Sequence, residues 1–360
     1  MRVLLLGASG YLGRFVADRL LADPAVQLTA LGRSDDADVR FDLSTGSPGA
    51  LTRFLDAVHP GVVINCAGAI RGNARDLARH NTVSTATVCE SLRRSRCGAR
   101  LVHLGCAAEY GPAQTGSSTG EEAVPRPGGP YGVSKLAATE LVLASGLDAV
   151  VLRVFSPAGP GTPAGSPLGR IAEAMRRAMQ QGDSELKLGG LGAQRDFVDV
   201  RDVARAVHAA SLSAAQGVIN IGAGRAVRLR DAATMLARVA GYQGGLHEVE
   251  ATGAHAAPGS AGVSTVPGAR GVPGAPSGPG GAHGLPAPGP PPGSASASAA
   301  GSPGGGTGHG PVPHPPPYPD GCGGWQQADV RTARDRLGWR PRIGLEESLA
   351  DIWMEAACRI

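Results

Sequence analysis

Residues 2–13, RVLLLGASGYLG, combine an apolar run with closely spaced glycines. The run ends abruptly at Gly7, and from Tyr11 to Leu21 apolar residues recur at helical spacing, which predicts a strand, a tight turn and a helix. Glycines in such a turn let the backbone approach a pyrophosphate, and the next helix N-terminus favours its negative charge. The spacing is GxxGxxG and not the commoner GxGxxG, so a turn without a ligand stays open as the alternative. The turn predicts a dinucleotide site with contacts from Gly7, Ser9, Gly10, Tyr11, Leu12 and Gly13.

Strands and helices continue to alternate along the first third of the chain. Strands are predicted at residues 26–31, 61–68 and 99–105, and a helix at residues 73–94 separates the last two. This alternation is typical of an α/β fold with a doubly wound parallel sheet. Cys66, Ala67 and Gly68, which end the third strand, are expected to lie along the same cofactor.

Arg33 follows the second predicted strand, where a dinucleotide site faces the adenosine ribose. An acid here hydrogen-bonds the ribose 2′-hydroxyl, whereas an arginine accommodates a 2′-phosphate. Arg33 therefore favours NADP(H) over NAD(H). Asp35 and Asp36 follow at once and take the ribose role if the strand ends later than predicted.

A second motif, YGVSK at residues 131–135, begins a predicted helix directly after Pro130. Tyr131 and Lys135 stand one helical turn apart on one face. A nearby ammonium favours the phenolate and lowers the pKa of a tyrosine, so the pair can pass a proton to or from an alcohol or ketone. The alternative is a tyrosine at a helix start and a solvated lysine.

In this order the two motifs resemble those of an extended short-chain dehydrogenase/reductase, the NAD-dependent epimerase/dehydratase family. The group includes nucleotide-sugar epimerases, 4,6-dehydratases and 4-keto-6-deoxysugar reductases. Further segments carry the resemblance: Asp42-Leu43, Asn81, residues 105–111, 152–155, 194–204, 219–224, 328–330 and 337–341. It implies a Rossmann-type sheet with a smaller C-terminal substrate lobe, adenine contacts from Asp42 and Leu43, and a structural Asn81 at the cofactor site.

The segment 105–111 departs from the family pattern, because Cys106 stands where the catalytic serine or threonine is expected. A thiol donates a weaker hydrogen bond than a hydroxyl does. Three interpretations stay open: Cys106 does the serine's work less well, packs as a small apolar residue that shapes the pocket, or acts as an acid itself.

The neighbouring positions bear on the substrate. Ala107 and Ala108 replace an acid pair of the family's 4,6-dehydratases, which argues against dehydration. By resemblance, Glu109 contacts the substrate, Ser156 replaces a common asparagine, and Arg195 binds a substrate diphosphate. The alternatives are that Glu109 points away from the pocket and that Arg195 pairs with Asp196.

Residues 251–320 contain 18 glycines and 17 prolines. Such a composition cannot bury a core and predicts a disordered insertion without catalytic residues. Its four histidines lack ligand spacing, so no metal site is expected. For this insertion, a neutral expansion of the chain or a tether to a partner protein is favoured over a lid on the substrate pocket. A dinucleotide-binding lobe is expected at 1–155 with a return segment at 191–224, and a substrate lobe at 156–250 and 321–360.

The formal net charge of the 360 residues is +4, and the arginines are scattered, so nucleic acid is an unlikely partner. Six cysteines show no CxxC spacing, and the sequence shows neither a cleavage-site pattern nor a membrane span, which predicts a cytosolic, reduced protein. The family resemblance implies a homodimer formed through the helices that carry Asn81 and Tyr131.

Together these features favour an NADP(H)-dependent ketoreductase that acts on a 4-keto-6-deoxy nucleotide sugar or a related natural-product ketone. Tyr131 would donate the proton, Lys135 would lower its pKa and orient the cofactor ribose, and Cys106 would line the carbonyl side. The alternatives are a nucleotide-sugar epimerase that retains NAD, and a non-catalytic dinucleotide-binding sensor.

Overall fold

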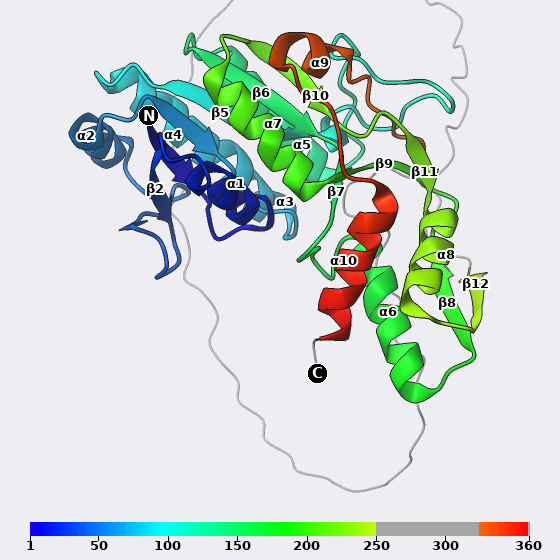
Figure 1. The fold of residues 1–360 in the computed structure, drawn as a ribbon. Helices are drawn as coiled ribbons and strands as arrows, with labels where there is room; N and C mark the ends of the chain where they lie inside the picture. Colours follow the sequence, from blue (N-terminus) through cyan, green and yellow to red (C-terminus); the bar gives the residue numbers. More distant parts are fainter. Residues whose placement is uncertain (250–323, 359–360) are drawn as a thin grey trace, which may run out of the picture. The chain divides into compact units, whose positions relative to one another are not determined.

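The computed structural model describes residues 1–249 and 324–358, which belong to one compact unit. Seven parallel strands form its central sheet in the order β10-β6-β5-β4-β1-β2-β3 (Figure 1). The strands are β1 (Arg2–Leu6), β2 (Gln27–Gly32), β3 (Val39–Arg40), β4 (Val62–Asn65), β5 (Arg100–Cys106), β6 (Ala149–Val154) and β10 (Gly217–Ile221). The predicted doubly wound α/β fold is confirmed.

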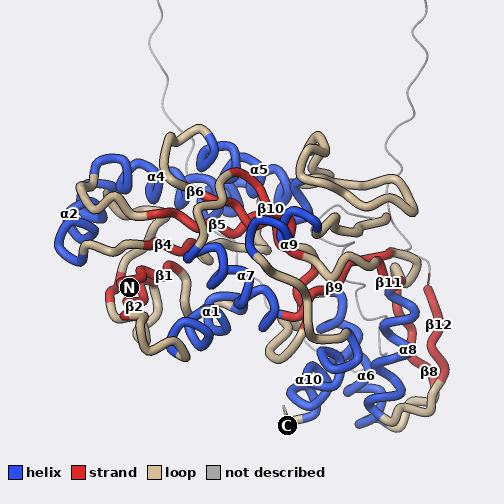
Figure 2. The backbone as a smooth tube through the Cα atoms, turned by 45° about the horizontal axis from the view of Figure 1, so that its top comes forward, coloured by secondary structure: helices blue, strands red, loops and turns tan. Residues whose placement is uncertain are grey.

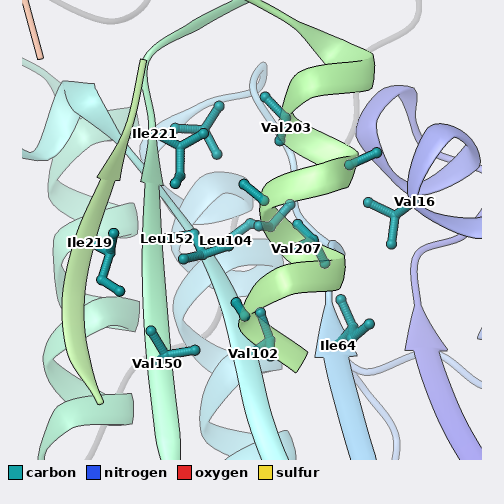
Figure 3. Close-up of a cluster of buried hydrophobic side chains, with 14 of the residues drawn as sticks. Val16, Ile64, Val102, Leu104, Val150, Leu152, Val203, Val207, Ile219 and Ile221 are labelled. Atoms are coloured by element: carbon teal, nitrogen blue, oxygen red, sulfur yellow. The ribbon is translucent and has the colours of Figure 1, made fainter. Parts of the chain in front are cut away.

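Helices cover both faces of this sheet. On one face lie α1 (Tyr11–Leu21) and α7 (Val200–Leu212), with α9 (Arg331–Leu337) beside β10; on the other lie α2 (Pro48–Val58), α4 (Ser84–Arg94) and α5 (Pro130–Leu143). Figure 3 shows Val16 of α1 and Val203 and Val207 of α7 packed over apolar strand residues. Because strand side chains alternate between faces, β4, β5 and β6 are buried along almost their whole length, as expected of a sheet covered on both sides.

A second hydrophobic core lies beyond the carboxyl ends of the strands. It is formed chiefly by α6 (Pro167–Gln181), α8 (Leu229–Ala240) and α10 (Leu345–Ala357), next to the strand pair β8 (Glu185–Gly189) and β12 (Gly245–Val249) (Figure 2). A three-stranded sheet of β7 (Ser156–Ala158), β9 (Gln194–Asp199) and β11 (Ala226–Arg228) lies between the two cores. The C-terminal part of the fold thus has a hydrophobic core of its own.

The long helix predicted at residues 73–94 consists of three consecutive segments. These are α3 (Ala74–Leu77), the π-helical turn η1 (Ala78–Val83) and α4. The π turn contains Asn81, whose side chain forms hydrogen bonds with Ala69 and with Ser134. Such turns occur mostly at functional sites. Periodicity predicted the helical run but could not reveal the wider turn.

The insertion, the lobe boundaries and the homodimer remain predictions. Residues 251–320, with their four histidines, lie outside the described residues. The lobe boundaries are untested, and the structure describes one chain, so the homodimer also stays a prediction. None of the helices in residues 1–249 and 324–358 has the length and apolar character needed to span a membrane.

The strand order creates a crevice at the carboxyl ends of β1 and β4. From β1 the chain builds outward through β2 and β3, and from β4 it builds in the opposite direction through β5, β6 and β10. Ligands of open α/β sheets bind where the strand order reverses. Gly7 follows β1 and Cys66 follows β4, and the N–H of Cys66 donates to the carbonyl oxygen of Leu6 at 3.0 Å.

One buried carboxylate fastens the C-terminal segment to α7. The Oδ2 of Asp202 accepts hydrogen bonds from the backbone N–H groups of Arg342 and Ile343 at 2.7 and 3.0 Å. Its Oδ1 pairs with Arg205, whose Nε lies 3.1 Å away. The indole N–H of Trp339 donates to the Asp202 carbonyl oxygen at 2.9 Å. Asp202 therefore holds in place the chain segment that leads into α10.

We expect Asp202→Ala to lower the free energy of unfolding by about 3 kcal/mol, because it leaves buried N–H groups and a guanidinium without an acceptor. Urea unfolding followed by circular dichroism measures this change. Asp335→Ala is the matched control, since it breaks the exposed Arg334–Asp335 pair and should leave the unfolding midpoint in place. An unchanged midpoint for Asp202→Ala would contradict the assignment.

Candidate active site

The glycine turn packs too closely for side chains at two of its positions. Gly7 has φ +79°, and a Cβ there would lie 2.8 Å from the backbone nitrogen of Ala67. A Cβ at Gly13 would lie 2.0 Å from the carbonyl oxygen of Gly7. Helix α1 begins at Tyr11, directly after the N-cap residue Gly10, so its positive end faces the crevice. The turn and helix therefore form a cradle that suits a pyrophosphate.

Two adjoining cavities lie along this turn, and both are lined by Gly10, Cys66, Ala67 and Gly68. The arginine cavity, named for Arg33, has a volume of about 490 Å³. The tyrosine cavity, named for Tyr131, has a volume of about 440 Å³. Because the two cavities meet at the glycine turn, they provide space for the two ends of a dinucleotide.

The arginine cavity brings together several residues predicted to hold the cofactor: Gly7, Ser9, Arg33, Asp42 and Leu43. The Oγ of Ser34 is buried here and has no hydrogen-bond partner among the described residues. The guanidinium of Arg33 is exposed at this cavity, and an arginine fork suits a phosphate group.

The two acids that follow Arg33 do not line this cavity. Asp35 forms an exposed ion pair with Arg40 at 2.8 Å, and Asp36 also lies outside the lining. Strand β2 ends at Gly32, so Arg33 is the first residue after the strand, the position expected to face the adenosine ribose. The alternative that Asp35 or Asp36 contacts the ribose finds no support in this placement.

The tyrosine cavity is built where β5 ends against the start of α5. Tyr131 and Lys135 come from the first turns of α5, and Cys106 is the last residue of β5. A side-chain hydrogen bond joins Cys106 to Tyr131. Burial raises the pKa of the Cys106 thiol, so the thiol is neutral near pH 7. The structure therefore places the three predicted catalytic side chains together.

Lys135 lies beneath this group and is 7% exposed. Its ammonium donates a hydrogen bond to the carbonyl oxygen of Leu104 at 2.6 Å. Burial lowers the pKa of Lys135 from its ordinary value, and the carboxylate of Glu109 acts in the opposite direction. Lys135 is thus buried, which rules out the solvated lysine of the alternative interpretation.

Asn81 joins the loop after β4 to helix α5. Its Oδ1 accepts from the N–H of Ala69 at 2.8 Å, and its Nδ2 donates to the Ala69 carbonyl oxygen and to the Oγ of Ser134, both at 2.9 Å. The Ser134 hydroxyl donates to the Tyr131 carbonyl oxygen at 2.8 Å. Asn81 lines the tyrosine cavity, and its contacts fix the backbone that carries Tyr131.

Ser156 lines the tyrosine cavity as expected, whereas Glu109 and Arg195 do not. Glu109 is fully buried in an ion pair with Arg153, so the expected substrate contact does not fit its position. Arg195 is also fully buried and donates to the carbonyl oxygens of Gln194 and Gly324 at 3.0 and 2.9 Å. Contact with a diphosphate would require Arg195 to leave these carbonyls.

Three further residues at the site, Thr162, Gln326 and Ser134, were not predicted from the sequence. The Tyr11 hydroxyl lies 3.0 Å from the Oγ1 of Thr162, which ties the glycine turn to the loop before α6. Gln326 lines the tyrosine cavity from beyond the insertion. Ser134 could have been found, because it lies inside the YGVSK motif, but no local pattern marks Thr162 or Gln326.

Comparisons with known proteins agree with this geometry. The profile of the NAD dependent epimerase/dehydratase family matches residues 3–222. The chain is 33% identical to dTDP-6-deoxy-L-talose 4-dehydrogenase (NAD(P)(+)) of Kitasatospora kifunensis, over 98% of this chain and 94% of that relative. It is 30% identical to GDP-6-deoxy-D-mannose reductase of Pseudomonas aeruginosa, over 66% of this chain and 80% of the relative.

Solved structures share the fold at lower identity. The protein RMD of Pseudomonas aeruginosa, complexed with NADPH, has a TM-score of 0.71 and 20% identity, covering 99% of both chains. The UDP-glucose 4-epimerase of Thermus thermophilus, in complex with NAD, has a TM-score of 0.69 and 20% identity, covering 100% of both chains. With its family profile and its relatives over nearly the whole length, the chain belongs to the NAD-dependent epimerase/dehydratase family, NAD(P)-dependent enzymes of the extended short-chain dehydrogenase/reductase type.

Proposed function

We propose that the protein is an NADP(H)-dependent ketoreductase that acts on a 4-keto-6-deoxy nucleotide sugar or a related natural-product ketone. The observation that carries this proposal is the grouping of Tyr131, Lys135 and Cys106 in a cavity continuous with the glycine turn. The two curated relatives, a dehydrogenase and a reductase of 6-deoxy nucleotide sugars by name, support the substrate class.

The protein's own residues would move the proton. When bound, the nicotinamide supplies the hydride for the carbonyl carbon. The O–H bond of Tyr131 breaks as the substrate oxygen takes its proton, which leaves a phenolate. The Lys135 ammonium stabilises that phenolate, and the Leu104 carbonyl keeps the ammonium in place. The hydroxyl product forms without any acid other than Tyr131.

The lining of the tyrosine cavity supports reduction over dehydration. Eliminating water from a sugar calls for a carboxylic acid near the substrate, and the family's dehydratases carry an acid pair where this chain has Ala107 and Ala108. Within the described residues, the lining contains neither aspartate nor glutamate. Tyr131 is therefore the group proposed to donate the proton.

Tyr131→Phe removes the proton donor, so we expect kcat to fall by about 10²- to 10⁴-fold while NADPH still binds. The measurement is NADPH oxidation with a panel of 4-keto-6-deoxy nucleotide sugars. Tyr242→Phe removes a hydroxyl that bonds the Asp183 carbonyl oxygen in the second core, and it serves as the control. Undiminished turnover by Tyr131→Phe would exclude the assignment.

Arg33→Ala removes the guanidinium proposed to bind the 2′-phosphate, so we expect NADPH to bind about ten- to a hundredfold more weakly and NADH to be unaffected. Fluorescence titration with both cofactors measures this. Arg40→Ala, an exposed arginine outside the cavity lining, is the control. Co-purified NAD that does not exchange would favour the epimerase instead.

Cys106→Ser and Cys106→Ala distinguish the roles open to this thiol. If Cys106 donates a weak hydrogen bond, as we propose, serine keeps or raises kcat, and alanine lowers it by about three- to tenfold. Steady-state rates with NADPH and the ketone provide the test. Equal rates for alanine and the native enzyme would show that Cys106 only fills space.

A further inference from the structure

A buried ion pair lies directly behind the active-site turn. Glu109 and Arg153 are 0% and 2% exposed, and the Arg153 Nε donates to the Glu109 Oε2 at 2.7 Å. The Arg153 guanidinium also stacks over the Tyr110 ring, 4.5 Å from its centroid. The Tyr110 hydroxyl in turn donates to the Oδ1 of Asn220 at 2.8 Å. Both charges are therefore held firmly by their surroundings.

The second carboxylate oxygen of Glu109 holds the turn that carries Cys106. Glu109 Oε1 accepts a hydrogen bond from the Cys106 N–H at 2.7 Å, and the Cys106 sulfur accepts one from the Ala108 N–H at 3.4 Å. Together they form a capping box on the short helix η2 (Ala107–Glu109). A Cβ at Gly105 would lie 2.8 Å from Glu109 Oε1, so the glycine is what allows this close approach.

The same carboxylate acts on the catalytic cation. Its charge raises the pKa of Lys135, against the larger effect of burial, which lowers it. Other titratable groups that act on this ammonium come from β5 and from the end of β4: His103, Cys106 and Cys66. Tyr131 of α5 lines the same cavity. Of these neighbours, Glu109 is the one that forms a buried ion pair and binds the Cys106 turn at once.

We propose that the Glu109–Arg153 pair is a positioning device, which holds the Cys106 turn and a negative charge against Lys135 and Tyr131. This role rests on the proposed reduction at Tyr131. Arg153 comes from β6 and fixes one carboxylate oxygen, which leaves the other free for the Cys106 N–H. Neither Glu109 nor Arg153 lines the tyrosine cavity, so neither touches the substrate. They act through Cys106 and Lys135.

The composition of the chain offers a direct readout, because Lys135 and Lys187 are the only lysines in the sequence. Protein labelled with [13Cε]lysine therefore gives two lysine signals, which Lys187→Arg assigns. Titrating the cofactor-free enzyme by NMR follows the Lys135 ammonium without any substrate. Lys187 lies on β8, outside the cavity lining, and serves as the internal reference.

In Glu109→Gln we expect Lys135 to titrate at a lower pH than in the native enzyme, because the carboxylate that favours its charge is gone. The Lys187 signal should not move. Glu173→Gln, which removes an ion-paired glutamate from α6, is the matched control and should leave the Lys135 signal in place. An unshifted Lys135 signal in Glu109→Gln would overturn the proposal.

Glu109→Gln leaves the Arg153 guanidinium buried without its partner, so a paired variant keeps the test valid if the single variant does not fold. Glu109→Gln/Arg153→Met removes both charges and fills a similar space. The downward displacement of the Lys135 titration is expected here too, since it comes from the lost carboxylate. A native-like titration in the paired variant would show that the ion pair only supports the fold.

Kinetics separate positioning from direct substrate contact. For the proposed reduction, we expect Glu109→Gln to lower kcat by about tenfold with an unchanged KM for the ketone. A raised KM with native kcat would instead place Glu109 on the substrate and overturn the proposal. If the ketone panel shows no turnover while the Lys135 signal shifts, the proposed reaction fails and the effect of Glu109 on Lys135 stands.

Discussion

The proposed reaction depends on keeping the Lys135 ammonium charged in a buried position. Lys135 is 7% exposed, and burial lowers its pKa, yet the proposed role of Tyr131 requires a positive charge nearby, because such a charge makes a phenol a better proton donor. The surroundings compensate in two ways. The Leu104 carbonyl accepts a hydrogen bond from the ammonium, and the Glu109 carboxylate favours its charged form. The close packing of β5 against α5 is therefore a condition for the chemistry as well as for the fold.

The choice of lysine at this position has a chemical reason. Of the 34 lysine and arginine residues, only Lys135 and Lys187 are lysines. Arginine forms the buried Arg153–Glu109 ion pair, and its planar guanidinium also lies over the Tyr110 ring, 4.5 Å from the centroid. An ammonium is a compact charge on a flexible stem, and that of Lys135 donates to a single carbonyl oxygen, that of Leu104.

The cavity shows how one fold supports different reactions. The glycine turn and the Tyr131–Lys135 pair are the parts of the site to which we assign the cofactor and the proton in the proposed reaction. On the turn after β5, Ala107 and Ala108 supply no acid to the tyrosine cavity, and Cys106 supplies a thiol. The acid that this turn does contain, Glu109, is directed into the protein by Arg153. Side-chain direction, and not composition alone, thus decides which chemistry is available.

The sequence alone determined the features that depend on neighbours along the chain. The strand, glycine turn and helix of residues 2–21 and the spacing of Tyr131 and Lys135 follow from local periodicity, and both were predicted. The placement of Glu109 was decided only by the tertiary structure. Its carboxylate meets Arg153, 44 residues away, because β5 and β6 pair in a register that sets Gly105 opposite Arg153. Asn81 reaches Ser134 on α5 for the same reason, since long-range pairing of strands and helices fixes side-chain directions that no local pattern encodes.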